Sequence, residues 1–512
     1  MDIRDNFTTI KKGGLKILIF CSLLELLIFG GYENLFGCLL FIYAWCIMSR
    51  YVLTPYNLRF YLLPTLVVFG YIFSYYFLPL LATLVENKPL TFKFEVPYLT
   101  FINNFINVNI IIIAFCLSKK CQPAKLLLNK IWTKLGYFSQ PTPRQIWALG
   151  IIGFLCLGYI VATQKVADSF ADLEANTEGG FIISVIGQIA NSYTSFPLFL
   201  LFPFLLGMNK TNKVNKKNLA IYFILYVLAC MATTRRSLIM YPIATVILAN
   251  IILNLYKGKK IFTGKKSIYI IIALWITTGP LADLAFAMAL NRHNVSGKGT
   301  FFTVVETLSD GEKLHNLRQL ALKAIDNSND FGWSEYYVDN IFMDRFCNLR
   351  VQDATLFYAQ KLGFADQGMK DFAKSSILRD LPTFLLNLLG EKREVTTTPA
   401  DYICMRYFNT SYLVGNRVSG DTGTGLFWLG YWYYPFALVI YLFLFIMFSS
   451  FVKTTNGNCY YPVPVVASLM MYFTYLINSY GILWSIHVLL RNCWQEIIIY
   501  CAIFAIVRKF IK

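Results

Sequence analysis

The chain has 512 residues, of which 56% are hydrophobic and 14% are charged. A soluble protein of this length would not tolerate that balance, so the composition excludes the soluble classes and predicts a polytopic membrane protein. The formal net charge of +18 lies mostly in short loops between apolar runs. Such charges set the orientation of the helices in the membrane, so they do not indicate a nucleic-acid-binding surface.

Apolar runs long enough to cross a bilayer recur along the whole sequence. We predict twelve transmembrane helices, at residues 15–31, 34–49, 60–84, 99–118, 146–164, 181–207, 218–234, 237–256, 267–290, 424–452, 462–478 and 482–507. The first run lacks a small-residue cleavage pattern and a second run follows it closely, so we expect no cleaved signal peptide.

Lysine and arginine are concentrated in alternate connections between these runs. The N-terminus, 119–145, 208–217, 257–266 and the C-terminal tail are basic, whereas 165–180 carries four acidic residues and one lysine. Short basic loops stay on the cytoplasmic side of a membrane. Twelve spans with both termini in the cytoplasm satisfy all of these loops, and this is the predicted topology.

One polar interval, from Asn291 to Asp421, interrupts the apolar pattern. It holds 16 of the 28 acidic residues and 15 of the 46 basic residues of the chain, and it is too polar to cross a bilayer. We therefore expect three parts: an N-terminal membrane bundle of about nine helices over 1–290, an external segment over 291–423, and about three C-terminal membrane helices over 424–512.

The external segment has helical periodicity, so the predicted fold class is all-α. A helix capped by Asp310 is expected to run to Ile325, and a second is expected to begin at Ser334. A third near 351–362 should end before a glycine. The apolar run 381–389 is too short to span and predicts an interfacial or re-entrant piece lying on the bundle.

Several ionisable side chains fall inside predicted spans: Glu25, Asp283, His487, Arg491 and Glu496. Such groups cost about 2.5–3.5 kcal/mol at the bilayer centre, so they are usually sequestered in the bundle or in a wet cavity. His487, Arg491 and Gln495 recur every four residues and form one polar stripe. Each alone is explained by bonds to neighbouring helices, but the set indicates a polar cavity that opens outward.

Arg235 and Arg236 depart from the charge rule, because they lie at the tip of the 218–256 hairpin, which is predicted to be external. One interpretation is a miscounted helix, or a pair of arginines that only caps two helix ends. The other is a fork for a phosphate or diphosphate, since guanidinium groups give fixed, bidentate hydrogen bonds to such oxyanions.

Nucleotide-binding and hydrolase motifs are missing from the sequence, which has no Walker loop, dinucleotide glycine fingerprint, HExxH or GxSxG. Two acidic pairs, Asp172/Glu174 and Asp310/Glu312, have a spacing that can grip a divalent metal, although the second pair is equally well explained as a helix cap. We therefore predict neither a metal nor a cofactor.

Two cysteines, Cys347 and Cys404, are the only ones placed outside the membrane. In an oxidising compartment they could form a disulfide. The other ten lie in or near helices and show no metal-ligand spacing.

The stretch 379–436 combines a Pro-containing apolar piece, a Lys-bearing turn and a polar run with an aromatic-rich helix start, Gly425–Gly430 and Trp432–Tyr434. Arg345 and Arg350 lie in the earlier run FMDRFCNLRVQDA. With one large external loop late in the chain, this pattern resembles the Wzy-type oligosaccharide repeat-unit (O-antigen) polymerases. The resemblance covers the architecture of the whole chain and motifs over about a fifth of it.

This resemblance implies a metal-independent, GT-C-like membrane glycosyltransferase in the bacterial cytoplasmic (inner) membrane. Such an enzyme transfers a growing glycan from its undecaprenyl diphosphate carrier onto the next lipid-linked repeat unit at the outer face. The implied partners are the lipid-linked donor and acceptor, membrane lipids and a chain-length regulator, with no nucleic acid.

The implied chemistry needs a cationic clamp on the leaving diphosphate and a base for the acceptor hydroxyl. The catalytic candidates are Asp421, Asp401, Arg345 and Arg417, with the two aspartates preferred as bases over His293 and Asp283. The substrate-binding candidates are Arg235, Arg236, Arg292, Arg406, His487 and Arg491. For each residue alone, a surface or packing role is the simpler interpretation.

Two other classes stay open. A lipid-linked oligosaccharide flippase or polysaccharide transporter fits the helix count, although we see no internal repeat of the kind transporters show. An O-antigen ligase, a glucosyltransferase or an acyltransferase also fits. An acyltransferase would be expected to show a paired His or His/Asp motif, and His487 has no such neighbour in the sequence.

Overall fold

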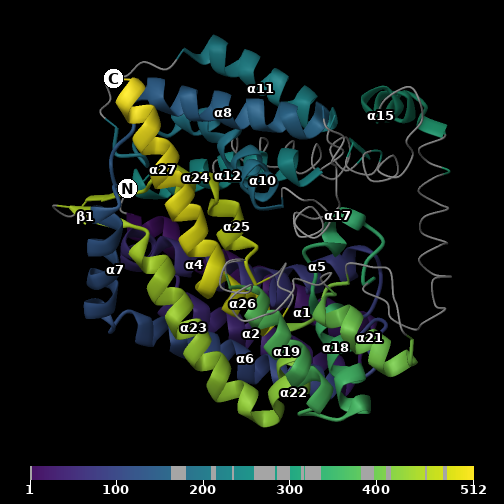
Figure 1. Cartoon of the computed structure of the whole chain (residues 1–512). Coiled ribbons are helices and arrows are strands. Elements are labelled where there is room, and N and C mark those ends of the chain that lie inside the picture. The colour runs from purple at the N-terminus through teal and green to yellow at the C-terminus, as the bar shows by residue number, and fades with distance from the viewer. Residues whose placement is uncertain are drawn as a thin grey trace.

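The computed structural model of the protein describes residues 3–162, 180–208, 215–232, 236–258, 283–284, 287, 300–312, 316, 336–381, 397–410, 417–455, 458–476 and 481–511. Over this part of the chain the fold is almost entirely helical, with one two-stranded antiparallel hairpin (Figure 1). Seven described helices are long and apolar enough to cross a membrane. The prediction of an all-α polytopic membrane protein is thereby confirmed at this level.

The N-terminal half begins with seven α-helices and one π-helical turn. They are α1 (Ile3–Ile28), α2 (Tyr32–Tyr51), α3 (Pro55–Phe60), α4 (Leu62–Ile72), η1 (Phe73–Phe77), α5 (Leu78–Val85), α6 (Pro97–Ser118) and α7 (Gln122–Lys134). The next described helices are α8 (Pro143–Ala162), α10 (Gly180–Tyr193), η2 (Phe196–Leu201), α11 (Lys216–Ala232), α12 (Arg236–Tyr256) and α15 (Thr300–Ser309). The π turn η1 joins α4 and α5 into one continuous span, Leu62–Val85.

The remaining described elements belong to the polar interval and the C-terminal helices. The first group is α17 (Ile341–Asp344), α18 (Leu349–Leu362), α19 (Gln367–Arg379), α21 (Pro399–Phe408) and α22 (Asp421–Leu429). The second is η4 (Gly430–Trp432), α23 (Tyr433–Ser450), β1 (Lys453–Thr455), β2 (Asn458–Tyr460), α24 (Val463–Ala467), α25 (Leu469–Phe473), α26 (Ile482–His487), η5 (Val488–Asn492) and α27 (Cys493–Phe510).

Most of the predicted spans coincide with described helices, but two of them are broken. The run 181–207 is divided into α10 and the short 3₁₀ helix η2, where Pro197 supplies no backbone N–H for a continuing α-helix. The run 462–478 contains α24 and α25, which are separated at Ser468. The span 267–290 lies almost wholly outside the described residues. The total of twelve therefore stays a prediction.

α15 ends at Ser309, directly before the expected cap Asp310. Residues 311, 312 and 316 are helical, so a helix begins after Asp310 as predicted, and most of its expected length lies outside the described residues. The polar interval differs from its predicted helices at the next one. The segment after Ser334 contains no helix over residues 336–340 and forms only the four-residue α17. Its backbone N–H groups bond to the Glu86 and Asp344 carboxylates, which replace helical partners. The third helix, α18, ends before Gly363 as predicted.

Connections that the charge rule assigns to one side of the membrane contact one another. The hydroxyl of Tyr256 donates to the carbonyl of Leu58 at 2.7 Å, and the amide of Tyr461 donates to the carbonyl of Leu205 at 3.0 Å. The hydroxyl of Tyr460 reaches the carbonyl of Phe138 at 3.3 Å. In Figure 1 this group, with α7, β1 and both chain ends, lies on the left, and α17 to α19 and α21 lie on the right.

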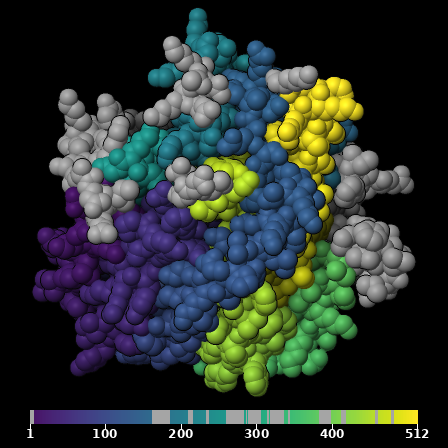
Figure 2. Space-filling view, turned by 90° about the vertical axis from the view of Figure 1, so that its left-hand side faces the viewer, coloured from purple at the N-terminus to yellow at the C-terminus, as the bar shows by residue number. Residues whose placement is uncertain are grey.

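The helix α7 was not predicted within the basic connection 119–145. It buries Trp132, whose indole N–H donates to the Ser450 hydroxyl at 2.8 Å and thereby fastens α7 to the end of α23. Figure 2 shows the face of the molecule that carries α7, with the C-terminal helix beside the blue segment that contains α7 and α8. The basic connection 119–145 thus contains an ordered helix, α7, that lies across the ends of the membrane helices.

Helices α4 and α25 pack closely against each other at Gly70. A Cβ atom added at Gly70 would lie 1.7 Å from the Phe473 carbonyl oxygen, so only glycine permits this approach. Small residues at such crossings allow helices in a membrane to pack closely without a hydrophobic driving force from water.

We expect Gly70→Ala to destabilise the protein by about 1–3 kcal/mol, because the added methyl group meets backbone that cannot move aside. Gly158→Ala is the matched control, since Gly158 is helical and has no atom within 4 Å of its added Cβ. The midpoint of thermal unfolding of the full chain in detergent measures both. Equal midpoints for the two variants would contradict the close contact.

Candidate functional site

Helices α18, α19, α21 and α22 pack together, and we call them and the preceding segment that contains α17 the cap (residues 336–381, 397–410 and 417–429). α18 packs against α21, α22 and α6, and α19 packs against α22 and α26. One hydrophobic cluster combines Tyr358, Met369 and Ile403 of the cap with Leu483 and Ile486 of α26. The cap and the beginning of the last span therefore share a core.

The cap is anchored to the membrane bundle by Asp353, whose side chain is fully buried. Its carboxylate accepts hydrogen bonds from the backbone amides of Glu95 at 2.7 Å and Val96 at 3.1 Å, at the start of α6. It also accepts from the Thr100 hydroxyl at 2.9 Å and pairs with Arg350 at 2.8 Å. Burial raises the pKa of Asp353, while these hydrogen bonds and Arg350 oppose that rise.

A second contact joins the cap to the connection before α6. The Glu86 carboxylate accepts from the backbone amides of Asp339 at 2.7 Å and Asn340 at 3.0 Å. The ammonium group of Lys88 lies 2.9 Å from Glu86 and 2.6 Å from Asp339. The Glu86 carboxylate and the Lys88 ammonium group, both largely buried, thus hold the connection to the cap, whereas the Asp339 side chain is 68% exposed.

His487 and Asp380 form a hydrogen-bonded dyad where the cap meets the last span. Nδ1 of His487 bonds the Asp380 carboxylate, and the two side chains remain 23% and 12% exposed. Trp484 stacks on the imidazole, with ring centroids 5.1 Å apart. Asp380 follows the last residue of α19, and His487 ends α26. The carboxylate therefore orients an imidazole whose other nitrogen is left for a proton transfer.

A polar chain continues from the dyad along the last span. The Nε of Arg491 donates to the Gln495 carboxamide at 3.0 Å, and Gln495 donates to Gln188 of α10 at 3.2 Å. Val488–Asn492 is a π-helical turn, a feature that is frequent at functional sites. Of the predicted stripe of His487, Arg491 and Gln495, the structure brings Arg491 and Gln495 into direct contact.

Two of the predicted catalytic residues, Arg417 and Asp401, pair with each other at 2.9 Å. Asp401 also accepts from the Thr398 hydroxyl at 2.8 Å, and Thr398 in turn caps α21 through the Asp401 amide. Thr398 is thus the N-cap of α21, and its hydroxyl also donates to the carboxylate of the residue whose amide it caps. These contacts give Asp401 a structural role. Because Asp401 is only 2% exposed, a substrate has little access to it.

Asp421, the first residue of α22, is surrounded by phenol groups on the inner side of the cap and is only 4% exposed. Its carboxylate accepts from the hydroxyls of Tyr433, at 3.2 Å, and Tyr441. Tyr433 also lies 3.3 Å from the Asn107 carboxamide, which donates to Tyr71 at 3.2 Å. In this conformation Asp421 is out of reach of a substrate that approaches from the surface.

The other candidate arginines fall in different places. Arg406 is half exposed and pairs with Asp366 at 3.2 Å on the cap, and Arg345 is exposed just after α17. Arg236 is the first residue of α12, and its side chain is not among those described. Arg235, Arg292, His293 and the pair Asp172/Glu174 lie outside the described residues. The phosphate-binding fork of Arg235 and Arg236 therefore stays a prediction.

The disulfide that Cys347 and Cys404 could form is not present, because the two cysteines are buried in different hydrophobic clusters. Asp310 and Glu312 are exposed. Among the described residues no group of three or more His, Cys, Asp or Glu side chains could hold a metal ion.

Asp380 is the site residue that sequence reasoning missed. It lies 107 residues from His487, and no spacing rule connects positions so far apart. The one available signal was its place in RDLP, at the end of a helical stretch and inside the segment that carries the family resemblance.

Comparison of the chain with protein-family models, with curated proteins and with solved structures finds no match.

Asp344 gives the cap a testable pH dependence. Its carboxylate accepts from the amides of Tyr337 at 2.9 Å and Val338 at 3.3 Å, and burial raises its pKa from 3.8 to about 6. The folded state thus binds this proton more tightly than the unfolded chain does. The contribution of Asp344 to stability is present below about pH 4 and is lost as the pH rises through about 6.

We expect Asp344→Asn to raise the thermal unfolding midpoint above that of the unmodified protein at pH 7 to 8, since the amide oxygen keeps the two hydrogen bonds without a buried charge. Below about pH 4 the two midpoints should converge. Asp371→Asn, on the exposed side of α19, is the matched control. An unchanged difference between pH 4 and pH 8 would argue against titration of Asp344.

Proposed function

We propose that the protein is a membrane glycosyltransferase that polymerises lipid-linked oligosaccharide repeat units, with the His487–Asp380 dyad as its catalytic centre. The dyad is the observation that carries the proposal. It joins the cap to the last span, it is partly exposed, and Arg491 lies one turn further along the same helix. A base beside a fixed cation is what glycosyl transfer from a diphosphate carrier requires.

The proposed topology has both termini in the cytoplasm and the cap outside. It is supported by the separate grouping of basic connections around α7 and of the cap around α6. Asp380 comes from the cap and His487 from the beginning of the last span, so the dyad would lie near the outer end of the bundle. A lipid-linked substrate in the outer leaflet would reach it at headgroup depth.

In the proposed reaction, Nε2 of His487 accepts the proton of an acceptor sugar hydroxyl. The hydroxyl oxygen forms a bond to the anomeric carbon of the donor as the bond from that carbon to the diphosphate oxygen breaks. The electron pair leaves with the undecaprenyl diphosphate. Asp380 fixes the imidazole tautomer and stabilises the imidazolium that forms.

Cationic groups would stabilise the negative charge that develops on the leaving diphosphate. Arg491 is nearest to the dyad in sequence and lies on the same helix. Arg417 and Arg406 belong to the cap, where their present partners are Asp401 and Asp366. Arg235, Arg236, Arg292 and Arg345 complete the proposed set. No step in this reaction uses a metal or a cofactor.

Acyl transfer is the second candidate, and the same dyad favours it. An acyltransferase is disfavoured by the sequence because His487 has no paired His or Asp nearby in the chain. In the fold, Asp380 supplies that partner. The polymerase remains preferred because Arg491, beside the dyad, suits a diphosphate leaving group. A ligase differs only in its acceptor.

We expect His487→Ala to slow chain extension at least about 100-fold, the range that a general base contributes. Asp380→Asn should also slow it, and Asp380→Glu should restore part of the activity. The surface polysaccharide on a gel should then show single repeat units without a ladder, with the protein present in the membrane at normal level. Lys374→Gln, exposed on α19, is the control. Normal ladders from His487→Ala would refute the base.

A deletion strain separates the function classes. Loss of the ladder with one unit retained indicates a polymerase, complete loss indicates a flippase, and polymer that stays unattached indicates a ligase. A normal polysaccharide with altered acylation would indicate the second candidate.

The topology has its own test. A phosphatase reporter that is active only outside the cytoplasm should be active when inserted near Lys374 and inactive near Lys130, because the cap and α7 are predicted to lie on opposite sides. Reversed activities would overturn the proposed topology and, with it, the outer position of the dyad.

A further inference from the structure

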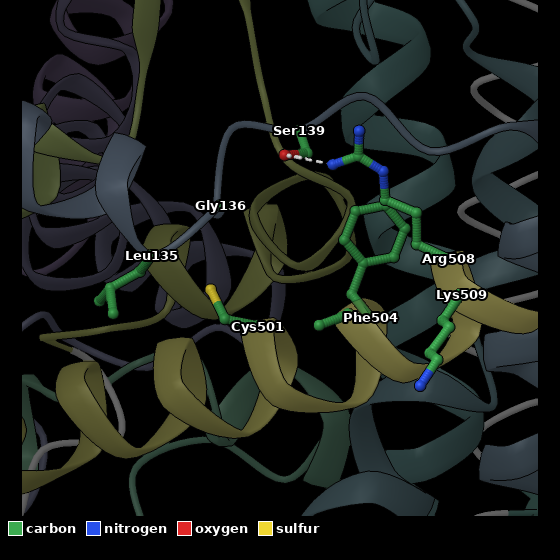
Figure 3. A pocket seen from close by; sticks show the side chains of 8 residues that line it. Leu135, Gly136, Ser139, Cys501, Phe504, Arg508 and Lys509 are labelled. Atoms are coloured by element: carbon green, nitrogen blue, oxygen red, sulfur yellow. Dashed lines mark hydrogen bonds between the residues drawn. The ribbon is translucent and has the colours of Figure 1, made fainter.

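A cavity of about 360 Å³ lies where the end of the last span meets the turn between α7 and α8 (Figure 3). The turn contributes Leu135, Gly136 and Ser139, and α27 contributes Phe504, Arg508 and others. Gly136 has φ +80°, a conformation that favours glycine, and its carbonyl accepts from the Ser139 amide at 3.0 Å. This turn holds the Ser139 hydroxyl toward α27.

One side of the cavity is cationic. Arg508 and Lys509 line it, and Nη1 of Arg508 lies 3.5 Å from the Ser139 hydroxyl. The lining contains no acidic side chain, and within the described part of the chain neither cation has an ion pair. The Arg508 guanidinium and the Ser139 hydroxyl face each other at the cavity, whereas the Lys509 side chain is directed away from them (Figure 3). A guanidinium and a hydroxyl without a counter-charge favour an anion with several acceptor oxygens, and Lys509 adds a second positive charge at the edge of the cavity.

The other side of the cavity is apolar and continues onto an exposed hydrophobic surface. Leu135, Phe504, Ala505 and Cys501 line the cavity. Just outside it, Ile506 and Phe510 are 59% and 77% exposed. Because α27 belongs to a membrane-spanning helix, such side chains at its end are suited to contact with acyl chains. The cavity thus places an anion site directly beside a lipid-facing surface.

We propose that this cavity binds an anionic phospholipid, with its phosphate held by Arg508 and Ser139, the charge of Lys509 attracting the headgroup from the edge, and one acyl chain lying along Phe504 and Leu135. Charge complementarity selects the anionic headgroup, and the apolar wall selects a lipid over a soluble phosphate. Basic pockets between the ends of membrane helices are known to suit such headgroups. The lipid would join α27 to the α7–α8 turn at the end of the bundle that lies opposite the cap.

The test uses the full-length protein in detergent and counts retained lipids by native mass spectrometry. Phosphatidylglycerol should be retained in preference to phosphatidylcholine. Arg508→Gln combined with Lys509→Gln should weaken phosphatidylglycerol binding about 30-fold, since each basic residue near a lipid surface contributes about 1 kcal/mol. Lys216→Gln combined with Lys217→Gln, two exposed lysines at the start of α11, should leave binding unchanged.

A second variant tests the cavity without changing its charge. Ala505→Phe should fill the apolar side and reduce retention of phosphatidylglycerol, whereas Ile506→Phe, outside the lining, should not. Equal retention of both lipids, or loss of binding in the lysine control alone, would overturn the proposal. Displacement of the lipid by millimolar inorganic phosphate would also overturn it, because the site would then serve a soluble anion. None of these outcomes depends on the glycosyltransferase proposal.

Discussion

The arrangement of the whole molecule depends on one buried carboxylate, that of Asp353. The first amides of a helix have no partner within the helix, and the helix N-terminus favours negative charge. Asp353 places its negative charge at this end of α6. It accepts from the amides of Glu95 and Val96 directly before the helix and from the Thr100 hydroxyl in its first turn. It also neutralises Arg350 on its own helix. Removing one member of a buried ion pair typically costs about 3–5 kcal/mol, because the other charge remains in the interior. The cap is therefore held at one fixed place on the bundle by charge, in addition to apolar contact.

Docking of α18 on α6 also fixes the elements that follow. α22 lies against α18 so closely that Cβ atoms added at Gly420 and Gly423 would meet Gln352 and Thr355. On the other side of α22, α19 packs on the last span and its end delivers Asp380 to His487 (Figure 1). The dyad is thus a consequence of cap docking. Its two members come from surfaces that meet only when the cap is seated.

Beneath the cap, a polar network crosses the interior of the bundle. It links Asp421 to the hydroxyls of Tyr433 and Tyr441 and, through Asn107, to Tyr71. Polar groups are costly within a membrane and are normally satisfied by one another. This network explains why an acidic residue is tolerated at the start of a span, and it separates the role of Asp421 from that of the partly exposed dyad above it. Asp421 is bound by side chains of neighbouring helices inside the bundle, whereas His487 remains partly exposed.

The sequence by itself determined what depends on local composition. Long apolar runs predict the described spans, because only helices satisfy their backbone in a bilayer. The alternation of basic loops predicts which connections meet, and the contacts around Tyr256 and Tyr461 follow that grouping. Only the tertiary structure decided the site. Partners far away in the chain determine the contact of Asp380 with His487, the packing of helix α7 and the non-helical course of residues 336–340. A carboxylate can orient an imidazole from any distance along the sequence once packing brings their atoms together, and local patterns carry no record of that packing.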